Sequence, residues 1–187
     1  LAVLQLHHAG MRSPVDEIGG QPVCPSDNEK TGARALSLAE VEQLKEDFIR
    51  AAMRAEQAGF DGVQVHGAHG YIIGQFLSPE INFRNDGYGG SLDGRARLLL
   101  EIVDGIRARC RDDYLLSVRL SPERFGMRLE EVIEISQALC DESKIDLLDI
   151  SLWDTFKMPV EETFSNRPLL DYFTALDRGN VRLGVAG

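Results

Sequence analysis

The stretch FDGVQVHGAHGY, residues 60–71, decides both the fold and the candidate chemistry of this 187-residue chain. Its first half is an apolar run that predicts a short buried strand over 60–65. His66, His69 and Tyr71 follow directly, where such a strand reaches the surface. An imidazole hydrogen-bonds near neutral pH and a phenol is a weak acid, so these groups are suited to hold a carbonyl oxygen and protonate a neighbouring carbon. The ordinary alternative is a strand-end loop with two solvated histidines and one packing tyrosine.

Strand and helix signals alternate on both sides of this stretch. Further apolar runs predict strands over 1–6, 114–120, 145–150 and 181–186. Helical spacing of apolar residues predicts helices that follow Ser37 and Ser91, and helices near 129–139 and 168–178. Ser37 and Glu40 form a capping-box signature. The segments 10–36 and 66–90, rich in Gly, Pro and Asn, are predicted to be long loops.

This alternation favours a parallel sheet, in either a (β/α)8 barrel or a doubly wound sheet. No G-x-G-x-x-G motif follows the first strand, which weakens a dinucleotide-binding Rossmann interpretation. Both long loops follow strands, and in a barrel such loops gather at the C-terminal face, where active sites lie. Five strands are too few to close a barrel. We therefore expect an α/β chain that forms part of a (β/α)8 barrel.

Composition narrows the partners and the compartment. The net charge of −10 argues against a nucleic-acid-binding face and an anionic membrane surface. No apolar run approaches the ~20 residues that span a bilayer. The three cysteines form no CxxC pair, so neither zinc nor a disulfide framework is indicated, and a reducing cytoplasm is expected. The sequence starts inside an apolar run without Met and ends like a strand cut at its tip, which predicts a piece of a longer chain.

Two motifs carry a family resemblance that covers nearly the whole chain. HGAHGYIIGQFLSP at 66–79, continued by NFRNDGYGGS at 82–91, resembles the old yellow enzyme family of FMN-dependent ene-reductases and NADH:flavin oxidoreductases. QLHHAG at 5–10 resembles the third barrel strand of that family, and SVRLS at 117–121 resembles a later strand. The resemblance implies that residues 1–187 are a partial FMN-binding (β/α)8 domain with strands 3 to 7, while strands 1, 2 and 8 lie outside.

The resemblance also implies a reaction. NADH or NADPH reduces FMN, and a hydride then passes to the β-carbon of an α,β-unsaturated carbonyl, a small enone or enal. His66 and His69 would hold the carbonyl oxygen through two N–H donors, and Tyr71 would protonate the α-carbon. A metal pair at the two histidines is disfavoured, because no carboxylate or cysteine stands at ligand spacing around them.

Cofactor binding is expected from three further positions. Gln5 would pair with the pyrimidine edge of the flavin, Arg119 would place a cation beside it, and Gly187 would lie near its phosphate. From the residues alone, Gln5 is equally a polar strand-end residue that faces water. Arg119, a charge inside an apolar strand, is equally a structural salt bridge to a nearby acid.

Other positions receive weaker expectations. The histidines at 7 and 8 should face opposite sides of their strand and are mainly structural. The polar residues of the second loop should brace it; they are Asn82, Arg84, Asp86 and Tyr88. Trp153 ends a strand and could line the pocket. The family often has Arg where this chain has Met11, although Arg12 follows, and Asn where this chain has Gly94. The departure at Met11 is expected to alter the substrate entrance, and the departure at Gly94 is expected to affect local structure only.

Three rivals stay open at this point. The chain as it stands is a non-catalytic truncated scaffold that cannot hold FMN alone, since an open five-strand piece leaves edges unpaired. It belongs to the dienoyl-CoA reductase-like branch of the family, where an iron–sulfur or second domain follows. An unrelated barrel hydrolase with paired carboxylates is the third, but no such pair stands at the strand ends. The sequence leaves open a homo-oligomer and does not give the natural substrate.

Overall fold

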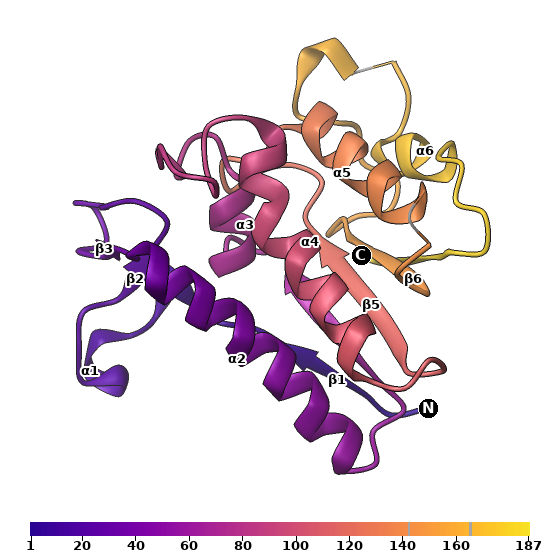
Figure 1. The fold of residues 1–187 in the computed structure, drawn as a ribbon. Helices are drawn as coiled ribbons and strands as arrows, with labels where there is room; N and C mark the ends of the chain where they lie inside the picture. The colour runs from indigo at the N-terminus through magenta and orange to yellow at the C-terminus, as the bar shows by residue number, and fades with distance from the viewer. Residues whose placement is uncertain (142, 165) are drawn as a thin grey trace.

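The computed structural model describes residues 1–141, 143–164 and 166–187, and its centre is a five-stranded parallel sheet (Figure 1). The strands, in spatial order, are β1 (Val3–Leu6), β4 (Gly62–Gly67), β5 (Leu115–Leu120), β6 (Leu147–Ser151) and β7 (Arg182–Ala186). Each strand therefore pairs with the next large strand along the chain. A doubly wound sheet would reverse this order at a switch point. The unbroken order is that of a (β/α)8 barrel segment and confirms the predicted fold class.

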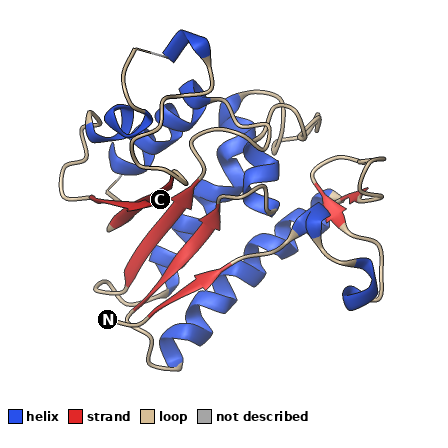
Figure 2. Ribbon diagram, turned by 180° about the vertical axis from the view of Figure 1, so that it is seen from behind, coloured by secondary structure: helices blue, strands red, loops and turns tan. Residues whose placement is uncertain are grey.

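Four helices connect the successive strands and cover one face of the sheet. They are α2 (Leu38–Gln57), α4 (Leu92–Arg109), α5 (Leu129–Asp141) and α6 (Leu169–Thr174). Neighbouring helices in this series contact one another. Figure 2 shows the sheet from behind, with the strands in front of these helices. The strand face that looks away from the helices is therefore the inner face of the barrel segment.

The first of these helices illustrates how the sequence sets its boundaries. Ser37 caps α2: its hydroxyl accepts from the Glu40 amide at 3.3 Å, and the Glu40 carboxylate accepts from the Ser37 amide at 2.8 Å. This confirms the predicted capping box. Gly59 lies just after the end of α2 and has φ +87°, a backbone conformation that suits a residue without Cβ. Between them, apolar side chains at helical spacing, Val41 and Phe48 among them, are buried against the sheet.

Strand side chains alternate between an apolar outer face and a polar inner face. Val63 and Val65 of β4 are fully buried in the core beneath the helices. Gln64, between them, instead donates to Ser117 at 3.0 Å and to Asp149 at 3.2 Å on the next strands. This alternation follows from the two-residue period of a strand. The inner face consequently carries a row of polar groups where a packed barrel would have apolar ones.

Two predictions around the central motif were wrong. The strand predicted over 60–65 runs from Gly62 to Gly67, so His66 lies within it and only 2% of its surface is exposed. The predicted loop 66–90 contains a helix, α3 (Ile72–Leu77), whose residues are all buried. A helix that is buried on every side shows no amphipathic period, which is why the sequence pattern missed it. Short elements were also missed, namely η1 (Gly10–Arg12), α1 (Val15–Ile18), β2 (Val23–Cys24), β3 (Arg34–Ala35) and η2 (Glu162–Phe164).

The rest of the second loop is braced as predicted. Arg84 pairs with Asp86 at 2.6 Å. The Asn82 amide donates to the carbonyls of Phe76 and Tyr88 at 2.7 and 2.8 Å. At the start of α4, a Cβ on Gly94 would lie 2.1 Å from the Gly89 carbonyl oxygen, so a larger residue requires a different loop path. The departure at Gly94 therefore belongs to local structure, as expected.

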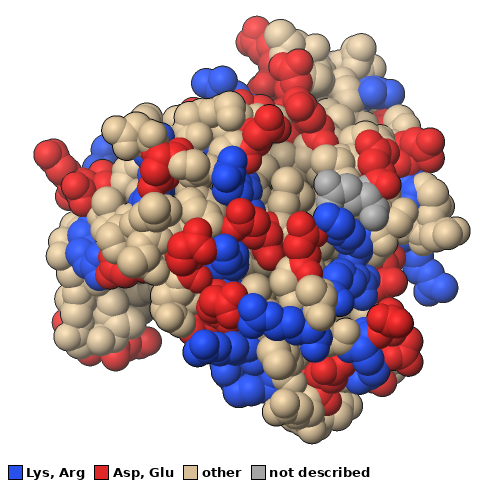
Figure 3. Space-filling model, viewed as in Figure 1, with Lys and Arg blue, Asp and Glu red and all other residues tan. Residues whose placement is uncertain are grey.

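Charged side chains of both signs are mixed over the molecular surface. Figure 3 shows Lys and Arg interleaved with Asp and Glu over the face that carries α2 and α4. Some of them pair between helices, as Arg109 does with Glu46 at 2.7 Å. Exposed pairs of this kind each contribute about 0–1 kcal/mol. No helix among the described residues is both long enough and apolar enough to cross a membrane.

Candidate active site at the carboxyl ends of the strands

The candidate site lies where the inner faces of three adjacent strands end. His66 of β4 stands beside Arg119 of β5 in register, and Arg119 stands beside Asp149 of β6. All three belong to the inward-facing set of side chains. Because parallel strands end at the same edge, this register brings side chains from distant parts of the sequence together.

The three residues predicted to be catalytic are brought together. The ring centroids of His66 and His69 lie 5.0 Å apart, and those of His66 and Tyr71 lie 5.4 Å apart. His69 and Tyr71 are 6.5 Å apart. His69 has φ +60° and Gly70 has φ +68°, and this turn folds the chain back over the end of β4. The His69 amide donates to the Ser121 hydroxyl at 2.9 Å, which holds the turn.

Hydrogen bonding leaves some of these polar groups occupied and others free. His69 Nε2 lies 2.7 Å from Ser151 Oγ, and that hydroxyl also accepts from Arg119 Nη2 at 3.1 Å. Ser151 therefore joins His69 to Arg119. His66 Nδ1 is buried without a hydrogen-bond partner among the described residues. A buried polar atom of this kind requires an explanation, and a bound ligand is one.

The electrostatic environment keeps both histidines neutral near pH 7. Burial is the largest cause that lowers the pKa of His66 to about 4, and the neighbouring His69, Arg119 and His7 lower it further. Burial, followed by Arg119 and Arg12, also lowers the pKa of His69. A neutral imidazole has one N–H donor and one acceptor nitrogen. Each ring is therefore able to donate one hydrogen bond to a carbonyl oxygen.

A pH dependence of stability follows from the lowered pKa of His66. Between the ordinary value of 6.5 and about 4, the unfolded chain binds a proton that the folded chain does not. The free energy of unfolding is therefore expected to fall as pH drops through this window. Urea unfolding of the full-length protein above pH 6.5 and near pH 4 measures this fall, which His66→Gln should reduce. An equal fall in the wild type and the variant would contradict a buried, neutral His66.

Arg119 forms the salt bridge that was named as its structural alternative. Its Nε lies 3.4 Å from Asp149 Oδ2, and both side chains are largely buried. The same Nε has no hydrogen bond within the described residues. Gln5 donates to Gln64 at 2.7 Å, and Gln64 in turn contacts Ser117 and Asp149. An amide and a guanidinium thus lie on one continuous polar face.

These groups fit a planar, polar cofactor such as a flavin. The pyrimidine edge of a flavin needs both donors and acceptors, which the Gln5 amide offers. Arg119 places a cation on the same face, and its Nε, although paired with Asp149, makes no hydrogen bond to a described residue. The residues present therefore suit the cofactor that the sequence predicts. Gly187 lies elsewhere, after β7, where a Cβ would approach Thr155 Oγ1 to 2.7 Å.

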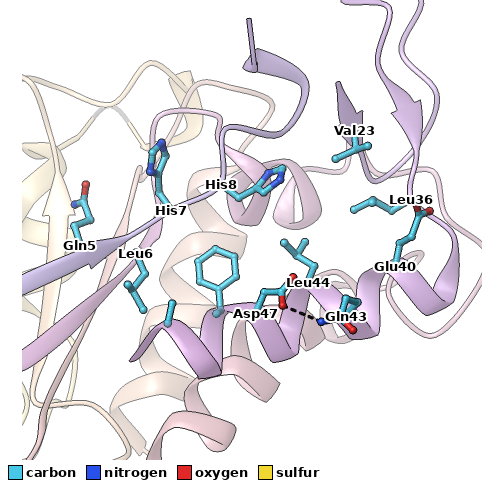
Figure 4. A pocket seen from close by; sticks show the side chains of 12 residues that line it. Gln5, Leu6, His7, His8, Val23, Leu36, Glu40, Gln43, Leu44 and Asp47 are labelled. Carbon is cyan, nitrogen blue, oxygen red and sulfur yellow. Dashed lines mark hydrogen bonds between the residues drawn. The ribbon is translucent and has the colours of Figure 1, made fainter. Parts of the chain in front are cut away.

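The two histidines of β1's continuation face opposite sides, as predicted. The ring of His7 lies 4.9 Å from that of Tyr71 and 6.1 Å from that of His66, so His7 belongs to the candidate site. His8 faces α2 instead, and its Nδ1 accepts from the Gly10 amide at 3.0 Å. His8 lies in a pocket of about 430 Å³ that Gln5 and His7 also line. Figure 4 shows His8 beside Leu44 and Asp47 of α2.

Arg12 also reaches the candidate site, one residue after the position where the family often has Arg. Its guanidinium carbon lies 5.4 Å from the centre of the Tyr71 ring. Its Nη1 donates to the His69 carbonyl at 2.5 Å. A pocket of about 350 Å³ opens here and is lined by Arg12, His69, Tyr71, Arg124, Phe125 and Trp153. Trp153 thus lines the pocket as expected.

Fold and site together define a class of protein: a (β/α)8 barrel segment whose inner face ends in a polar ligand site at the carboxyl ends of its strands. A model of the NADH:flavin oxidoreductase / NADH oxidase family matches residues 1–169, and the chain belongs to that family. Membership confirms the resemblance to old yellow enzymes and, at the level of the family, FMN and NAD(P)H as cofactors.

Individual relatives agree with this family. The chain is 42% identical over 164 residues to the NADH oxidase of Thermoanaerobacter brockii, which covers 83% of this chain and 25% of that protein. It is also 42% identical over 164 residues to the probable NADH-dependent flavin oxidoreductase YqiG of Bacillus subtilis, and this match covers 82% of this chain and 44% of YqiG. The structure of an old yellow enzyme homologue from Zymomonas mobilis superposes with a TM-score of 0.78 at 32% identity, over 97% of this chain and 55% of that one. The chain thus spans less than half of either curated relative.

Proposed function

We propose that the full-length protein is an FMN-dependent NAD(P)H oxidoreductase that reduces the carbon–carbon double bond of α,β-unsaturated carbonyl compounds. The observation that carries this proposal is the cluster of His66, His69 and Tyr71 beside Arg119 at the strand ends. Membership of a flavin oxidoreductase family supports the cofactor and the source of electrons. When bound, FMN supplies the hydride that NAD(P)H provides and the alkene receives.

His66 and His69 hold the carbonyl oxygen of the substrate in this proposal. Both rings are neutral near pH 7 and each has one N–H to offer. Negative charge grows on the oxygen as the β-carbon accepts a hydride, so the two donors stabilise the transition state more than the ground state. His69 has to share or release its contact with Ser151 Oγ in order to donate to the substrate.

Tyr71 donates the proton that the α-carbon requires. Its hydroxyl makes no hydrogen bond to any described residue, whereas its ring is held between His7 and Arg12. The ring is therefore fixed in position and the hydroxyl is free to reach a ligand. General acid catalysis needs this combination of a located donor and an open acceptor position.

Gln5, Arg119 and Gly187 bind the cofactor in this proposal. Gln5 pairs with the pyrimidine edge, and the Arg119 cation stabilises negative charge on the reduced ring. Gly187 contributes a backbone N–H near the phosphate, and its missing Cβ leaves room for the Thr155 side chain beside it. The charge of Arg119 is shared with Asp149, which fixes the guanidinium on the inner face.

Flavin uptake tests the proposal. The full-length protein should purify yellow, or take up FMN with the absorbance change of a bound flavin. A folded barrel that takes up no flavin would refute it. The rival, a scaffold that holds no FMN, is favoured by the two edges of the sheet, β1 and β7. Titration of residues 1–187 alone with FMN shows whether these five strands suffice or whether further strands are needed.

A further inference from the structure

Two arginines face the pocket beside Tyr71 and have no acidic partner among the described residues. Arg12 and Arg124 line the pocket of about 350 Å³ together with His69 and three aromatic side chains. Among the described residues that line this pocket, none is acidic. Neither arginine forms an ion pair with any carboxylate in the described part of the chain. The mouth of the site therefore holds two positive charges that no carboxylate in residues 1–141, 143–164 or 166–187 neutralises.

The nearest carboxylate in sequence is already engaged elsewhere. Glu123, which precedes Arg124, is buried and pairs with Lys157 at 2.8 Å. Its second oxygen accepts from the Val160 amide at 2.7 Å. Asp149 of β6 pairs with Arg119. These two carboxylates are thus occupied by other cations, and neither pairs with Arg12 or Arg124.

Aromatic rings position both guanidinium groups. The carbon of the Arg12 guanidinium lies 5.4 Å from the Tyr71 ring centre and 5.9 Å from that of Phe125. That of Arg124 lies 5.6 Å from the Trp153 ring centre. A guanidinium that stacks on a ring keeps its N–H edge free, and that edge matches the two oxygens of a carboxylate.

Several residues that line the pocket have a strained backbone conformation with positive φ. Five non-glycine residues in the described chain have positive φ, and four of them line this pocket: His69, Arg124, Phe125 and Trp153. Such conformations cost about 1–3 kcal/mol each and gather at functional sites. The turn that carries Arg124 is closed by its carbonyl, which accepts from the Met127 amide at 2.9 Å. It is tied to the barrel by Ser78, which donates to the Gly126 carbonyl at 2.8 Å.

We propose that Arg12 and Arg124 form an oxyanion subsite that binds a carboxylate or phosphate carried by the alkene substrate. The inference rests on the proposed function and narrows its substrate class. The preferred substrate is a planar α,β-unsaturated carbonyl compound with an anionic group at the end remote from the carbonyl. The aromatic walls cover the planar part, and the two guanidinium groups bind the oxyanion.

Matched substrates test the subsite in the full-length, FMN-loaded enzyme. The probes are cinnamaldehyde that carries either a 4-carboxylate or a 4-carboxamide, which have the same shape and differ in charge. Arg12→Gln and Arg124→Gln should each lower kcat/KM for the carboxylate about 10- to 100-fold more than for the carboxamide, because a charge-assisted pair is lost. Arg128→Gln removes the same charge from an exposed position outside the pocket and should leave the ratio unchanged.

Two kinetic outcomes would overturn the subsite. Equal losses for both probes would mean that Arg12 only braces the His69 carbonyl and that Arg124 only supports the wall. The second outcome is that the variants raise the KM for NADH but change neither the KM for 1-benzyl-1,4-dihydronicotinamide, which has no phosphates, nor the preference for the carboxylate probe. That result would assign the arginines to the phosphates of the dinucleotide. Free phosphate is added as a competitor in the reaction with the carboxylate probe. Inhibition that is lost in Arg124→Gln indicates that the subsite binds phosphate as well as carboxylate, whereas no inhibition indicates that it binds carboxylate alone.

A binding measurement keeps this proposal separate from the proposed function. 4-Formylbenzoate and 4-formylbenzamide lack a reducible alkene, so their calorimetric titration into the oxidised enzyme does not depend on turnover. Tighter binding of the benzoate, lost in Arg124→Gln, supports the subsite even in a protein that reduces no alkene. Equal binding of the two aldehydes overturns it, even in an active ene-reductase.

Discussion

Tyr71→Phe is expected to slow alkene reduction by about 10²- to 10⁴-fold, the usual contribution of a positioned general acid. Phenylalanine keeps the ring between His7 and Arg12 and removes only the hydroxyl. The proton for the α-carbon then has to come from water. Reduction of bound FMN by NADH involves no such proton, so that half-reaction should survive. Rapid mixing measures the two half-reactions separately.

The control for Tyr71→Phe is another tyrosine of the same chain. The Tyr172 hydroxyl donates to the Phe164 carbonyl at 2.7 Å and contacts Asn166, outside the candidate site. Tyr172→Phe should leave both half-reactions at their wild-type rates. If Tyr71→Phe abolished flavin reduction and spared the alkene step, the role of Tyr71 as proton donor would be wrong.

Replacing His66 with leucine should lower the rate of alkene reduction by about 10²- to 10³-fold, as the loss of one oxyanion donor does in other enzymes. His66 Nδ1 has no hydrogen-bond partner among the described residues, so the substitution breaks no bond to that atom. The loss should therefore appear in catalysis. His66→Asn keeps an N–H donor and should retain part of the rate. Steady-state kinetics with 2-cyclohexen-1-one gives the comparison.

His8 supplies the matched control for this second substitution. It follows β1, the strand next to β4, but its side chain faces α2, in the pocket of Figure 4. His8→Gln should leave the rate of the alkene step near that of the wild type. Equal rates for His66→Leu and His66→Asn would argue that His66 fills space and donates no hydrogen bond to the substrate.

The sequence predicted those parts of the fold that local patterns determine. The capping box of Ser37 and Glu40 and the apolar strands follow from periodicity and turn chemistry. The barrel order of the strands was implied by the family resemblance, because periodicity alone also allowed a doubly wound sheet. The family motif located His66, His69 and Tyr71 on one strand end. The structure places their rings close together, while their chemical roles stay predictions. The binding roles of Gln5, Arg119 and Gly187 likewise stay predictions.

The residues that the sequence missed depend on tertiary structure. Ser151 bridges His69 and Arg119 only because strand register puts β6 beside β5. Arg124 enters the pocket through positive φ, and nothing in a non-glycine residue type announces that conformation. His7 looked like a structural residue because its contact with Tyr71 spans a loop and a turn. Register and turn handedness, which single-sequence patterns do not determine, completed the site.

Transfer of deuterium tests the central claim most directly. The full-length enzyme, loaded with FMN, is incubated in ordinary water with 2-cyclohexen-1-one and NADH deuterated at the transferable position, and the product is analysed by NMR. The account predicts deuterium at the β-carbon and a solvent-derived proton at the α-carbon, with the carbonyl intact. Deuterium at the carbonyl carbon, or NADH oxidation without any change in the alkene, would contradict it.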